Sequence, residues 1–530
     1  GPRCAHRSSC PVRPRERMGR VWTVRRGRGS ERGTWQSFSF AKSRRVVTSG
    51  RPRSSPRPGV AVWWIRRDLR LHDNPALAAA AGHGVVLPVF VLDPHLSAQL
   101  RTPRGRFLLN SLRKLDERLR GQGSRLVVRS GDPAEVIPEL ARQTGAVAVY
   151  AQEDYSAYAR ARDRRVAERA PLVLLPGVTV HPPGSVANRE GRPYQVFSRY
   201  RETWLRLPRA RPRAAAPPFS TPEIPSEPLP HAPCPAEFPP GEQEALARLR
   251  AFAEGPQAPV YQYARDRHRM DLPATSCLSP YLRFGLVSPR AVLAAADTAA
   301  REAPDPEARR SAEIWRDQLV WREYFVSLLA SEPGLRTTPL RARFAHFAWR
   351  DDQASLRAWE EGRTGFPVVD AAMRQLRETG WIHNRARLVA ASFLSRLLLV
   401  DWRRGEQVFF SLLVDGDPAL NAGNWQWTAG VGSDAAPYVR LFNPVRQGQR
   451  FDPHGEYVKR WVPELCRVPP PYVHAPWTLP RDDQIAYRCR VGRDYPAPVV
   501  DLASARERAL RAFGSGLHKP LRPPTGRVRS

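Results

Sequence analysis

A regular alternation of short apolar runs and helical patterns between residues 60 and 175 limits the fold more than any other feature of the chain. The apolar runs occupy residues 60–65, 85–92, 125–129, 146–151 and 172–175. Runs this short and this continuously apolar are typical of parallel strands buried on both faces. Helical spacing lies between them, over residues 104–121, 133–144 and 156–169. The pattern predicts an α/β domain over residues 59–182 with a doubly wound, parallel, five-stranded sheet.

Proline then marks a change in organisation. Residues 183–240 are Pro-rich, which predicts a long linker between two domains. After Pro239 the apolar residues recur at helical spacing, over residues 241–254, 288–301, 308–331, 354–362, 367–379, 384–399 and 404–413. We therefore expect a second, all-α domain over residues 241–512.

The charge of the chain points to a polyanionic partner. The formal net charge is +33 and the isoelectric point is about 11.1, which favours nucleic acid. Residues 1–58 carry 16 Lys and Arg residues against 2 acidic ones, and the rest of the chain remains strongly basic. A GC-rich genome would also enrich arginine, so the bias alone does not identify DNA. We expect residues 1–58 to be a disordered basic extension and residues 513–530 a disordered tail.

The cysteines and the apolar runs indicate a cytoplasmic protein without a membrane segment. The six cysteines are scattered, with neither C-x-x-C nor a histidine cluster, so the sequence predicts no disulfide framework and no metal site. No apolar run approaches the roughly 18 residues of a membrane span. The basic N-terminus lacks the apolar stretch of a secretory signal.

Residues 381–440 carry the densest set of candidate functional side chains. Asn384 shares a predicted helix face with apolar residues at positions 388, 391 and 394. Asp417 followed by proline predicts a helix N-cap, which places Asn421 on the first turn, near unpaired backbone N–H groups. This position suits an anionic or hydrogen-bonding ring. Arg387 and Asp415 are the expected charge pair beside it, because neither is easily buried alone.

This stretch resembles the flavin-binding core of the photolyase/cryptochrome family. The similarity rests on W-I-H-N-R-A-R, D-G-D-P-A-L-N-A-G-N-W-Q-W, T-G-F-P-V-V-D-A-A-M-R and R-L-F-N-P, and V-A-V-W-W-I-R-R-D-L-R-L-H-D-N matches the family's usual start. It extends from about residue 60 to about residue 505 and is strongest to class I cyclobutane pyrimidine dimer photolyases. The resemblance implies a monomeric DNA repair enzyme that binds FAD and UV-damaged DNA. In such enzymes, photoexcited reduced FAD gives an electron to a flipped-out dimer, and the dimer splits.

The resemblance also assigns the FAD-binding residues. They are Tyr263, Thr275, Ser276, Cys277, Leu278, Ser279, Trp315, Trp381, Arg387, Asp415, Gly416, Asp417 and Asn421. Asn421 matches the residue that faces N5 of the flavin ring. The T-S-C-L-S run at residues 275–279 is weak evidence alone, because hydroxyl residues before a helix often only cap it.

The same comparison assigns residues to DNA and to the lesion. They are Arg267, Gln318, Trp321, Arg322, Asn384, Arg385, Trp427, Arg440 and Arg446. Gln318 departs from the family pattern, because dimer photolyases usually have Glu there, and Leu388 replaces a usual Met. Asn384 argues against the related (6-4) photolyases, which use His at this point. For Arg267, Arg440 and Arg446, solvated surface arginine is the competing interpretation.

The resemblance also implies an electron-transfer route and an antenna site. Trp349, Trp402 and Trp425 match the family's route for electrons from the protein surface to the flavin, although a single buried Trp is usually only core. Arg67, Asp154 and Arg283 match positions that bind a deazaflavin antenna in some members, where others use a folate or a second flavin.

Two other functions compete with repair. A cryptochrome-type photoreceptor, which signals through FAD photoreduction, is favoured by Gln318 and Leu388 and disfavoured by the basic charge and Asn384. A nucleic-acid binder without photochemistry would need a broken flavin site, and the flavin motifs are intact.

Overall fold

The computed structural model describes residues 59–234, 237–434 and 441–514. The predictions made for residues 1–58, for Arg440 and for most of residues 513–530 fall outside these ranges. Helix α20 (Leu502–Gly514) continues two residues into the predicted tail.

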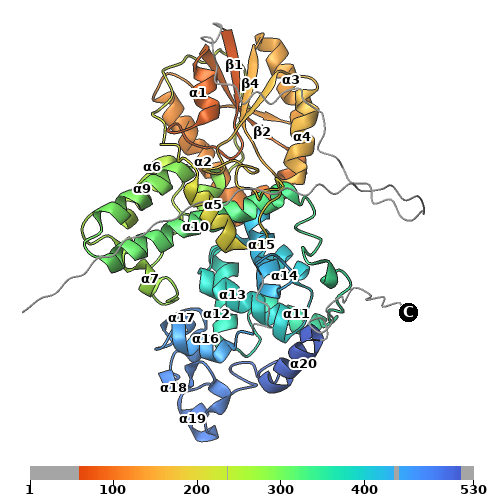
Figure 1. The fold of residues 1–530 in the computed structure, drawn as a ribbon. Coiled ribbons are helices and arrows are strands. Elements are labelled where there is room, and N and C mark those ends of the chain that lie inside the picture. The colour runs from red at the N-terminus through yellow and green to blue at the C-terminus, as the bar shows by residue number, and fades with distance from the viewer. Residues whose placement is uncertain (1–58, 235–236, 435–440, 515–530) are drawn as a thin grey trace, which may run out of the picture. The chain divides into compact units, whose positions relative to one another are not determined.

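The N-terminal part is a parallel five-stranded sheet, as predicted (Figure 1). Its strands are β1 (Gly59–Trp64), β2 (Gly84–Leu92), β3 (Val127–Ser130), β4 (Ala148–Gln152) and β5 (Leu172–Leu175). The strand order is β3-β2-β1-β4-β5, so the direction of winding reverses between β1 and β4. The crevice at the carboxyl ends of the strands on either side of such a reversal is where sheets of this kind bind ligands.

Helices cover both faces of this sheet. They are α1 (Pro75–Ala81), α2 (Pro103–Arg120), α3 (Pro133–Thr144) and α4 (Ala157–Ala167). Because side chains alternate along a strand, Val62 and Val149 pack into one core with residues of α3. Ala61 and Trp63 face the opposite side and belong to a core that continues into the helical part of the chain.

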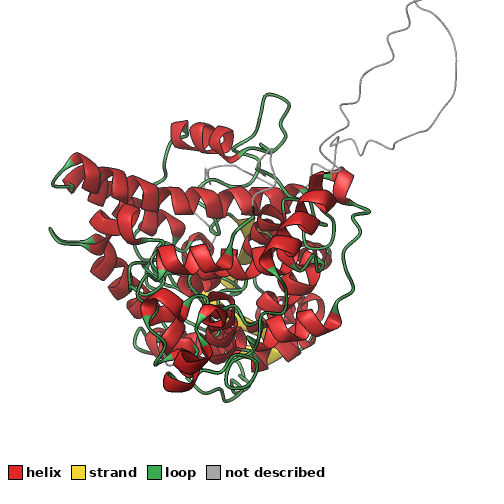
Figure 2. Cartoon of the chain, turned by 90° about the horizontal axis from the view of Figure 1, so that it is seen from below, coloured by secondary structure: helices red, strands yellow, loops and turns green. Residues whose placement is uncertain are grey.

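From residue 241 onward, the regular elements of the described chain are helices (Figure 2). Its helices are α6 (Glu242–Ala253), α7 (Tyr263–Asp266), α8 (Ser279–Phe284), α9 (Pro289–Glu302), α10 (Pro306–Ser331), α11 (Gln353–Glu361), α12 (Pro367–Thr379), α13 (Asn384–Ser392), α14 (Trp402–Leu412), α15 (Pro418–Ala429), α16 (Pro444–Phe451), α17 (Glu456–Trp461), α18 (Pro470–Val473), α19 (Arg481–Ala486) and α20. Helices α9, α10 and α15 begin with an acidic or hydroxyl N-cap followed by proline, as Asp305 does for α10. Helix α13 continues as a π-helical turn over Phe393–Leu397.

The Pro-rich linker contains a helix that the sequence pattern did not predict. Helix α5 (Phe197–Arg206) lies within residues 183–240 and buries Tyr200 and Trp204 against α10. Further along, Ser226 accepts a hydrogen bond from the backbone N–H of Val128 in β3 (2.9 Å). The linker therefore also covers an edge strand whose backbone would otherwise be open to pairing.

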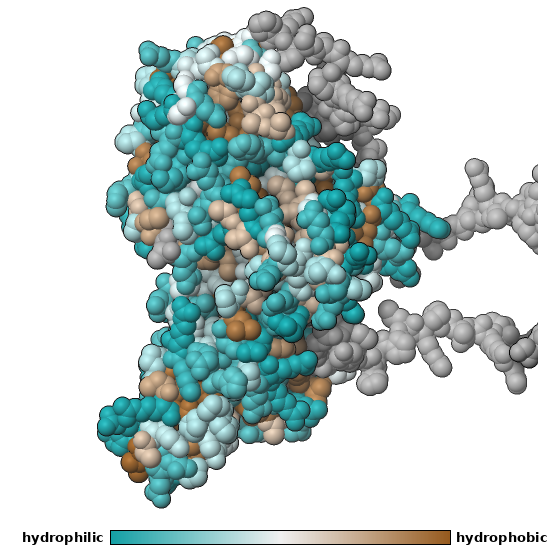
Figure 3. Space-filling model, turned by 90° about the vertical axis from the view of Figure 1, so that its left-hand side faces the viewer, coloured by the Kyte–Doolittle hydropathy of each residue, from teal (hydrophilic) through white to brown (hydrophobic). Residues whose placement is uncertain are grey.

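The face of the molecule shown in Figure 3 is mainly hydrophilic. On the face shown in Figure 3, hydrophobic side chains occur in separate patches among polar ones. Within residues 59–234, 237–434 and 441–514, no helix is both long and apolar enough to cross a bilayer.

Candidate functional site

The start of helix α15 organises the first group of candidate residues. Asp417 caps the helix, as predicted, and its carboxylate accepts hydrogen bonds from the backbone N–H groups of Ala419 (2.9 Å) and Leu420 (3.2 Å). Pro418 is the first helical residue. This arrangement holds Asn421 on the first turn, where it is 8 % exposed.

A hydrogen-bond network fixes the orientation of the Asn421 amide. Its Nδ2 donates to the backbone oxygen of Glu406 (2.9 Å) and to Glu406 Oε1 (3.0 Å). Arg336 holds the same carboxylate by a bidentate pair, with both contacts at 2.9 Å. Because Glu406 takes both amide protons, Asn421 presents Oδ1, an acceptor, on its other side. The sequence did not single out Glu406 or Arg336.

Arg387 and Asp415 form the predicted charge pair. Arg387 Nη1 and Nη2 donate to the two carboxylate oxygens of Asp415 at 3.1 and 2.8 Å, and Nε donates to the backbone oxygen of Ile382 (3.0 Å). The Asp415 side chain is 5 % exposed and that of Arg387 is 25 % exposed. Two parallel contacts set the plane of the guanidinium group as well as its position.

The aromatic and hydroxyl residues predicted for the flavin pocket also make contacts of their own. The rings of Tyr263 and Trp315 both contact Phe252, with centroids 6.0 and 5.1 Å away. In the 275–279 loop, Ser279 Oγ accepts a hydrogen bond from Trp381 Nε1 (3.4 Å). Cys277 in the same loop has a φ of 50°, so its backbone adopts a left-handed conformation that is uncommon for a residue with a side chain.

A second group lies on helices α10, α13 and α15, which pack as α10 against α15 and α13 against α15. Gln318, Trp321 and Trp427 are half-buried, and Asn384 is exposed. Gln318 Nε2 donates to the backbone oxygen of Ile314 (3.0 Å). The Oε1 atom of the same amide takes no part in this bond. The three helices thus present amide and aromatic groups at partly open positions.

Arg322 does not join this group. It is 7 % exposed, and its guanidinium donates to the backbone oxygens of Val178 and Leu282. The side chain joins the segment that follows β5 to α8. Its prediction as a DNA-contacting residue is not supported by this geometry, because a buried arginine with backbone partners does not reach a duplex.

A basic cluster forms around His268. The two ring nitrogens of His268 face Arg385 Nη2 (2.9 Å) and Arg267 Nε (3.3 Å). Burial and the charges of Arg385 and Arg267 lower the pKa of His268 to about 3, so the ring is neutral at pH 7. Burial and the charges of Arg267 and Arg450 lower the pKa of Arg385 to about 10. Two arginines beside a neutral histidine leave this cluster with a net positive charge, which attracts anions such as phosphate.

Arg446 occupies a different environment. It lies on the first turn of α16, and its side chain is exposed. No other candidate DNA-binding residue is as accessible, except Asn384, within the described ranges.

The three tryptophans of the predicted electron route belong to one core. Trp402 and Trp425 are 1 % and 2 % exposed, and the half-buried Trp349 packs against their cluster. The ring of Trp425 also contacts Trp359 (centroids 6.1 Å apart), which the sequence did not single out. Trp349 lies beside Phe347 and Phe513, so helix α20 covers part of this ring.

The three antenna candidates meet at the carboxyl ends of β1 and β4, where the winding reverses. Arg67 donates to Asp154 (3.2 Å) and to Asp417 (2.6 Å), and Arg283 Nε donates to the backbone oxygen of Gly416 (2.8 Å). Burial opposes ionisation of Asp417, but the charges of Arg67 and Arg283 outweigh it and keep the pKa of Asp417 below its ordinary value. These side chains therefore connect the sheet to helix α15. Among the described residues, Arg283 Nη1 has no hydrogen-bond partner.

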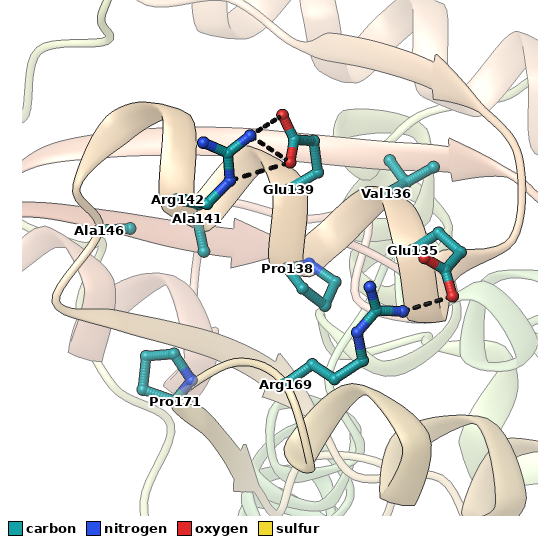
Figure 4. A pocket seen from close by; sticks show the side chains of 9 residues that line it. All are labelled: Glu135, Val136, Pro138, Glu139, Ala141, Arg142, Ala146, Arg169 and Pro171. Carbon is teal, nitrogen blue, oxygen red and sulfur yellow. Dashed lines mark hydrogen bonds and ion pairs between the residues drawn. The ribbon is translucent and has the colours of Figure 1, made fainter.

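A surface hollow of about 670 Å³ lies elsewhere, beside α3 and the start of β5. The charged side chains that line it pair with one another, Arg142 with Glu139 and Arg169 with Glu135 (Figure 4). Paired charges at an open surface position leave little to attract a specific ligand, so we assign no function to this hollow.

The N-cap of α13 predicts a pH dependence of stability. His383 is 4 % exposed, and its Nδ1 accepts a hydrogen bond from the backbone N–H of Arg385 (3.1 Å). Burial and the charges of Arg385 and Arg387 lower the pKa of His383 from 6.5 to about 4. Between these pH values the unfolded chain binds the proton more readily, so acidification favours unfolding.

We expect the free energy of unfolding to fall as the pH is lowered from 6.5 to 4. The contribution of His383 to this slope should approach about 1.4 kcal/mol per pH unit. His383→Asn keeps a side chain that caps helices well and should flatten the slope in urea titrations at a series of pH values. Parallel curves for the two proteins would contradict this role.

Comparisons with known proteins agree with one another. A family described as "DNA photolyase" matches residues 61–223, and one described as "FAD binding domain of DNA photolyase" matches residues 315–515. The deoxyribodipyrimidine photo-lyase of Thermus thermophilus is 42 % identical over 467 residues, which cover 86 % of this chain and 98 % of the relative.

Two solved structures are similar over nearly their whole length. A bacterial class III photolyase from Agrobacterium tumefaciens superposes with a TM-score of 0.80 at 37 % identity, covering 88 % of this chain and 99 % of the other. A cryptochrome from Synechocystis superposes with a TM-score of 0.78 at 29 % identity, covering 87 % and 100 %.

Proposed function

The chain belongs to the DNA photolyase family, and from this premise we propose that it uses light and FAD to split cyclobutane pyrimidine dimers in UV-damaged DNA. One observation carries the proposal. Each of three packed helices holds one residue of the predicted flavin pocket and at least one of the lesion pocket: Trp315 with Gln318 and Trp321 on α10, Arg387 with Asn384 on α13, and Asn421 with Trp427 on α15. The shared helices bring the electron donor close to its substrate.

The residues of the first group fit FAD. Asn421 offers a buried acceptor whose orientation Glu406 fixes, which suits a ring N–H donor. Hydroxyl groups at positions 275, 276 and 279 suit phosphate and ribityl oxygens. The Asp417 carboxylate is already used by the helix cap and by Arg67, so only its backbone remains for the cofactor. When bound, reduced FAD supplies the light-excited electron that splits the dimer.

The protein's own part is to bind, orient and exclude water. Arg387, held by Asp415, supplies fixed positive charge, and Trp381 and Trp315 wall the pocket. On the open side, Trp321 and Trp427 offer aromatic surface to bases that lose their stacking when they leave the duplex. Asn384 offers an amide for hydrogen bonding. Arg267, Arg385 and Arg446 supply charge for the phosphates of the strand.

The decisive experiment measures dimer loss from a UV-irradiated oligonucleotide under blue light. With purified, FAD-reduced protein, the dimers should disappear in the light and persist in a dark control. A cryptochrome-type photoreceptor, which Gln318, Leu388 and the Synechocystis relative favour, would photoreduce its flavin without removing dimers. We further propose that the protein acts as a cytoplasmic monomer; gel filtration would test the oligomeric state and cell fractionation the location.

With glutamine at position 318, we expect a lower repair yield per absorbed photon than with glutamate. A glutamine stabilises negative charge on the dimer carbonyls by hydrogen bonding but has no proton to share. Gln318→Glu adds an acid of the same length, a gain specific to the charged intermediate. We expect a higher repair yield per absorbed photon with a nearly unchanged dissociation constant, measured by flash-induced repair and by binding on one oligonucleotide. Equal yields would show that Gln318 is a neutral replacement.

For the tryptophans, we propose that Trp349, Trp402 and Trp425 pass electrons from the surface toward the cofactor pocket. Trp402→Phe should abolish light-driven reduction of oxidised, bound FAD, because phenylalanine is much harder to oxidise. Repair by protein reduced chemically beforehand should survive. Trp359→Phe is the matched control, since Trp359 also contacts Trp425. If only that control loses photoreduction, the electrons take another route.

A second, light-harvesting chromophore is common in the family, and a deazaflavin, a folate or a flavin would each serve. We propose that any such chromophore meets Arg67, Asp154 and Arg283 at the carboxyl ends of β1 and β4. The ion pairs with Asp417 already use most of these polar groups, which favours a ligand recognised chiefly by shape and by Arg283 Nη1. Absorbance of the purified protein, after the FAD contribution is subtracted, would test this placement.

A further inference from the structure

The ring of Trp321 contacts three other aromatic rings. Phe197, the first residue of helix α5, lies parallel to it, with centroids 3.5 Å apart and an interplanar angle of 8°. Phe325 lies 5.8 Å away at 30°, and Tyr324 meets the ring edge-on at 5.8 Å and 81°. Trp321 nevertheless remains half-exposed, so part of its surface is available to a ligand.

Helix α5 is anchored to α10 along its length. Arg201 pairs with Asp317 (2.8 Å), Tyr200 Oη lies 3.2 Å from Ser327 Oγ, and Trp204 Nε1 donates to Glu323 (2.7 Å). These contacts fix the helix from its second turn onward. Phe197 therefore approaches Trp321 from a rigid support rather than from a loose linker.

The turn that precedes α5 is anchored as well. The backbone N–H of Phe197 donates to Asp434 Oδ1 (3.0 Å), and the backbone N–H of Asp434 donates to the Gln195 oxygen (2.9 Å). Tyr324 Oη donates to the same oxygen (2.8 Å). The backbone at Phe197 therefore cannot move away from Trp321 without breaking these bonds.

We propose that Phe197, on the linker between the two domains, is a positioning residue that fixes the ring plane of Trp321 for stacking against a flipped-out pyrimidine. The proposal rests on the proposed repair function and extends the lesion site to a segment outside the helical domain. A tryptophan whose rotamer is fixed in advance loses less conformational entropy when it stacks on a base. The linker thereby takes part in substrate recognition.

A competing role would make Phe197 a stand-in for the base. In that case its ring would occupy the surface that the pyrimidine needs and would have to leave on binding. The anchors at both ends of the contact favour a fixed support instead. The two roles predict opposite effects of removing the ring, because a support strengthens lesion binding and a stand-in weakens it.

The test uses the full chain with bound FAD and compares dimer-containing with undamaged duplex. Phe197→Leu keeps most of the volume but removes the aromatic stack. It should reduce the ratio of affinities for damaged and undamaged DNA by roughly 2- to 12-fold, the usual strength of an aromatic pair. Affinity for undamaged duplex, FAD absorbance and the urea midpoint should stay near wild type, and Phe197→Tyr should retain the ratio. Val196→Ala, at an adjacent position 48 % exposed, is the control.

A double-mutant cycle separates positioning from a general effect on folding. In a Trp321→Ala background, Phe197→Leu should have no further effect on the ratio, because Phe197 acts only through Trp321. An undiminished effect in that background, an unchanged ratio in the single variant, or tighter dimer binding would each overturn the proposal. If wild type itself shows no preference for dimers, the repair function fails and this role fails with it. A wild-type preference that Phe197→Leu fully retains rejects the role of Phe197 alone.

Discussion

Asp415→Ala should yield a protein that purifies without its flavin. The substitution leaves Arg387 beside the pocket with one remaining contact, to the backbone oxygen of Ile382. Removing one member of a largely buried, bidentate pair costs about 2–3 kcal/mol, toward the low end of the usual range because Arg387 is 25 % exposed. That free energy corresponds to a roughly 30- to 150-fold lower affinity for FAD. Flavin absorbance per polypeptide after gel filtration measures it.

A second ion pair in the helical domain gives a matched control. Arg374 and Glu464 lie 2.7 Å apart with side chains 21 % and 33 % exposed, and Arg374 also donates to a backbone oxygen. Glu464→Ala should lower stability modestly and leave the FAD content unchanged. A yellow, fully loaded Asp415→Ala protein would show that the pair is structural. Equal FAD loss in both variants would show that destabilisation alone releases the cofactor.

The sequence predicted those parts of the fold and site that depend on local pattern. Apolar runs and their spacing located all five strands, because a strand buried on both faces has no polar positions. Asp417 and Pro418 predicted the start of α15 for the same local reason: the cap and the first helical residue are neighbours in the chain. The Arg387–Asp415 pair followed from the cost of burying either charge alone.

Long-range partnerships escaped prediction. Glu406 contacts Asn421 across 15 residues, and a glutamate on an amphipathic helix is normally a surface residue. Arg67 contacts Asp417, which lies 350 residues further along the sequence, so the local sequence pattern did not predict this partner. Helix α5 was missed because the prolines on both sides of it dominate the composition of the linker, whereas Tyr200 and Trp204 stabilise the helix through tertiary packing on α10.

The lesion pocket and the phosphate contacts should respond differently to substitution. Trp321→Ala removes the aromatic surface that we propose stacks on a base only when that base leaves the duplex. The ratio of affinities for damaged and undamaged DNA should fall by about 1–3 kcal/mol, or roughly 5- to 150-fold. Arg446→Ala removes an exposed charge that we propose contacts phosphate in any DNA sequence. Binding to both duplexes should weaken alike, and the slope of log affinity against log salt should flatten by about one unit.

Trp321→Phe is the control for a loss of folding, because it keeps an aromatic ring against Phe197 and Phe325. It should retain most of the preference for dimers that Trp321→Ala loses. In the salt titration, Trp321→Ala should leave the slope of log affinity against log salt unchanged, because stacking on a base releases no counterions. If both the alanine variant of Trp321 and that of Arg446 changed the ratio equally, the separation of lesion pocket from phosphate contacts would be wrong. A single surface would then serve both purposes, and the half-buried position of Trp321 against Phe197 of α5 would need another explanation.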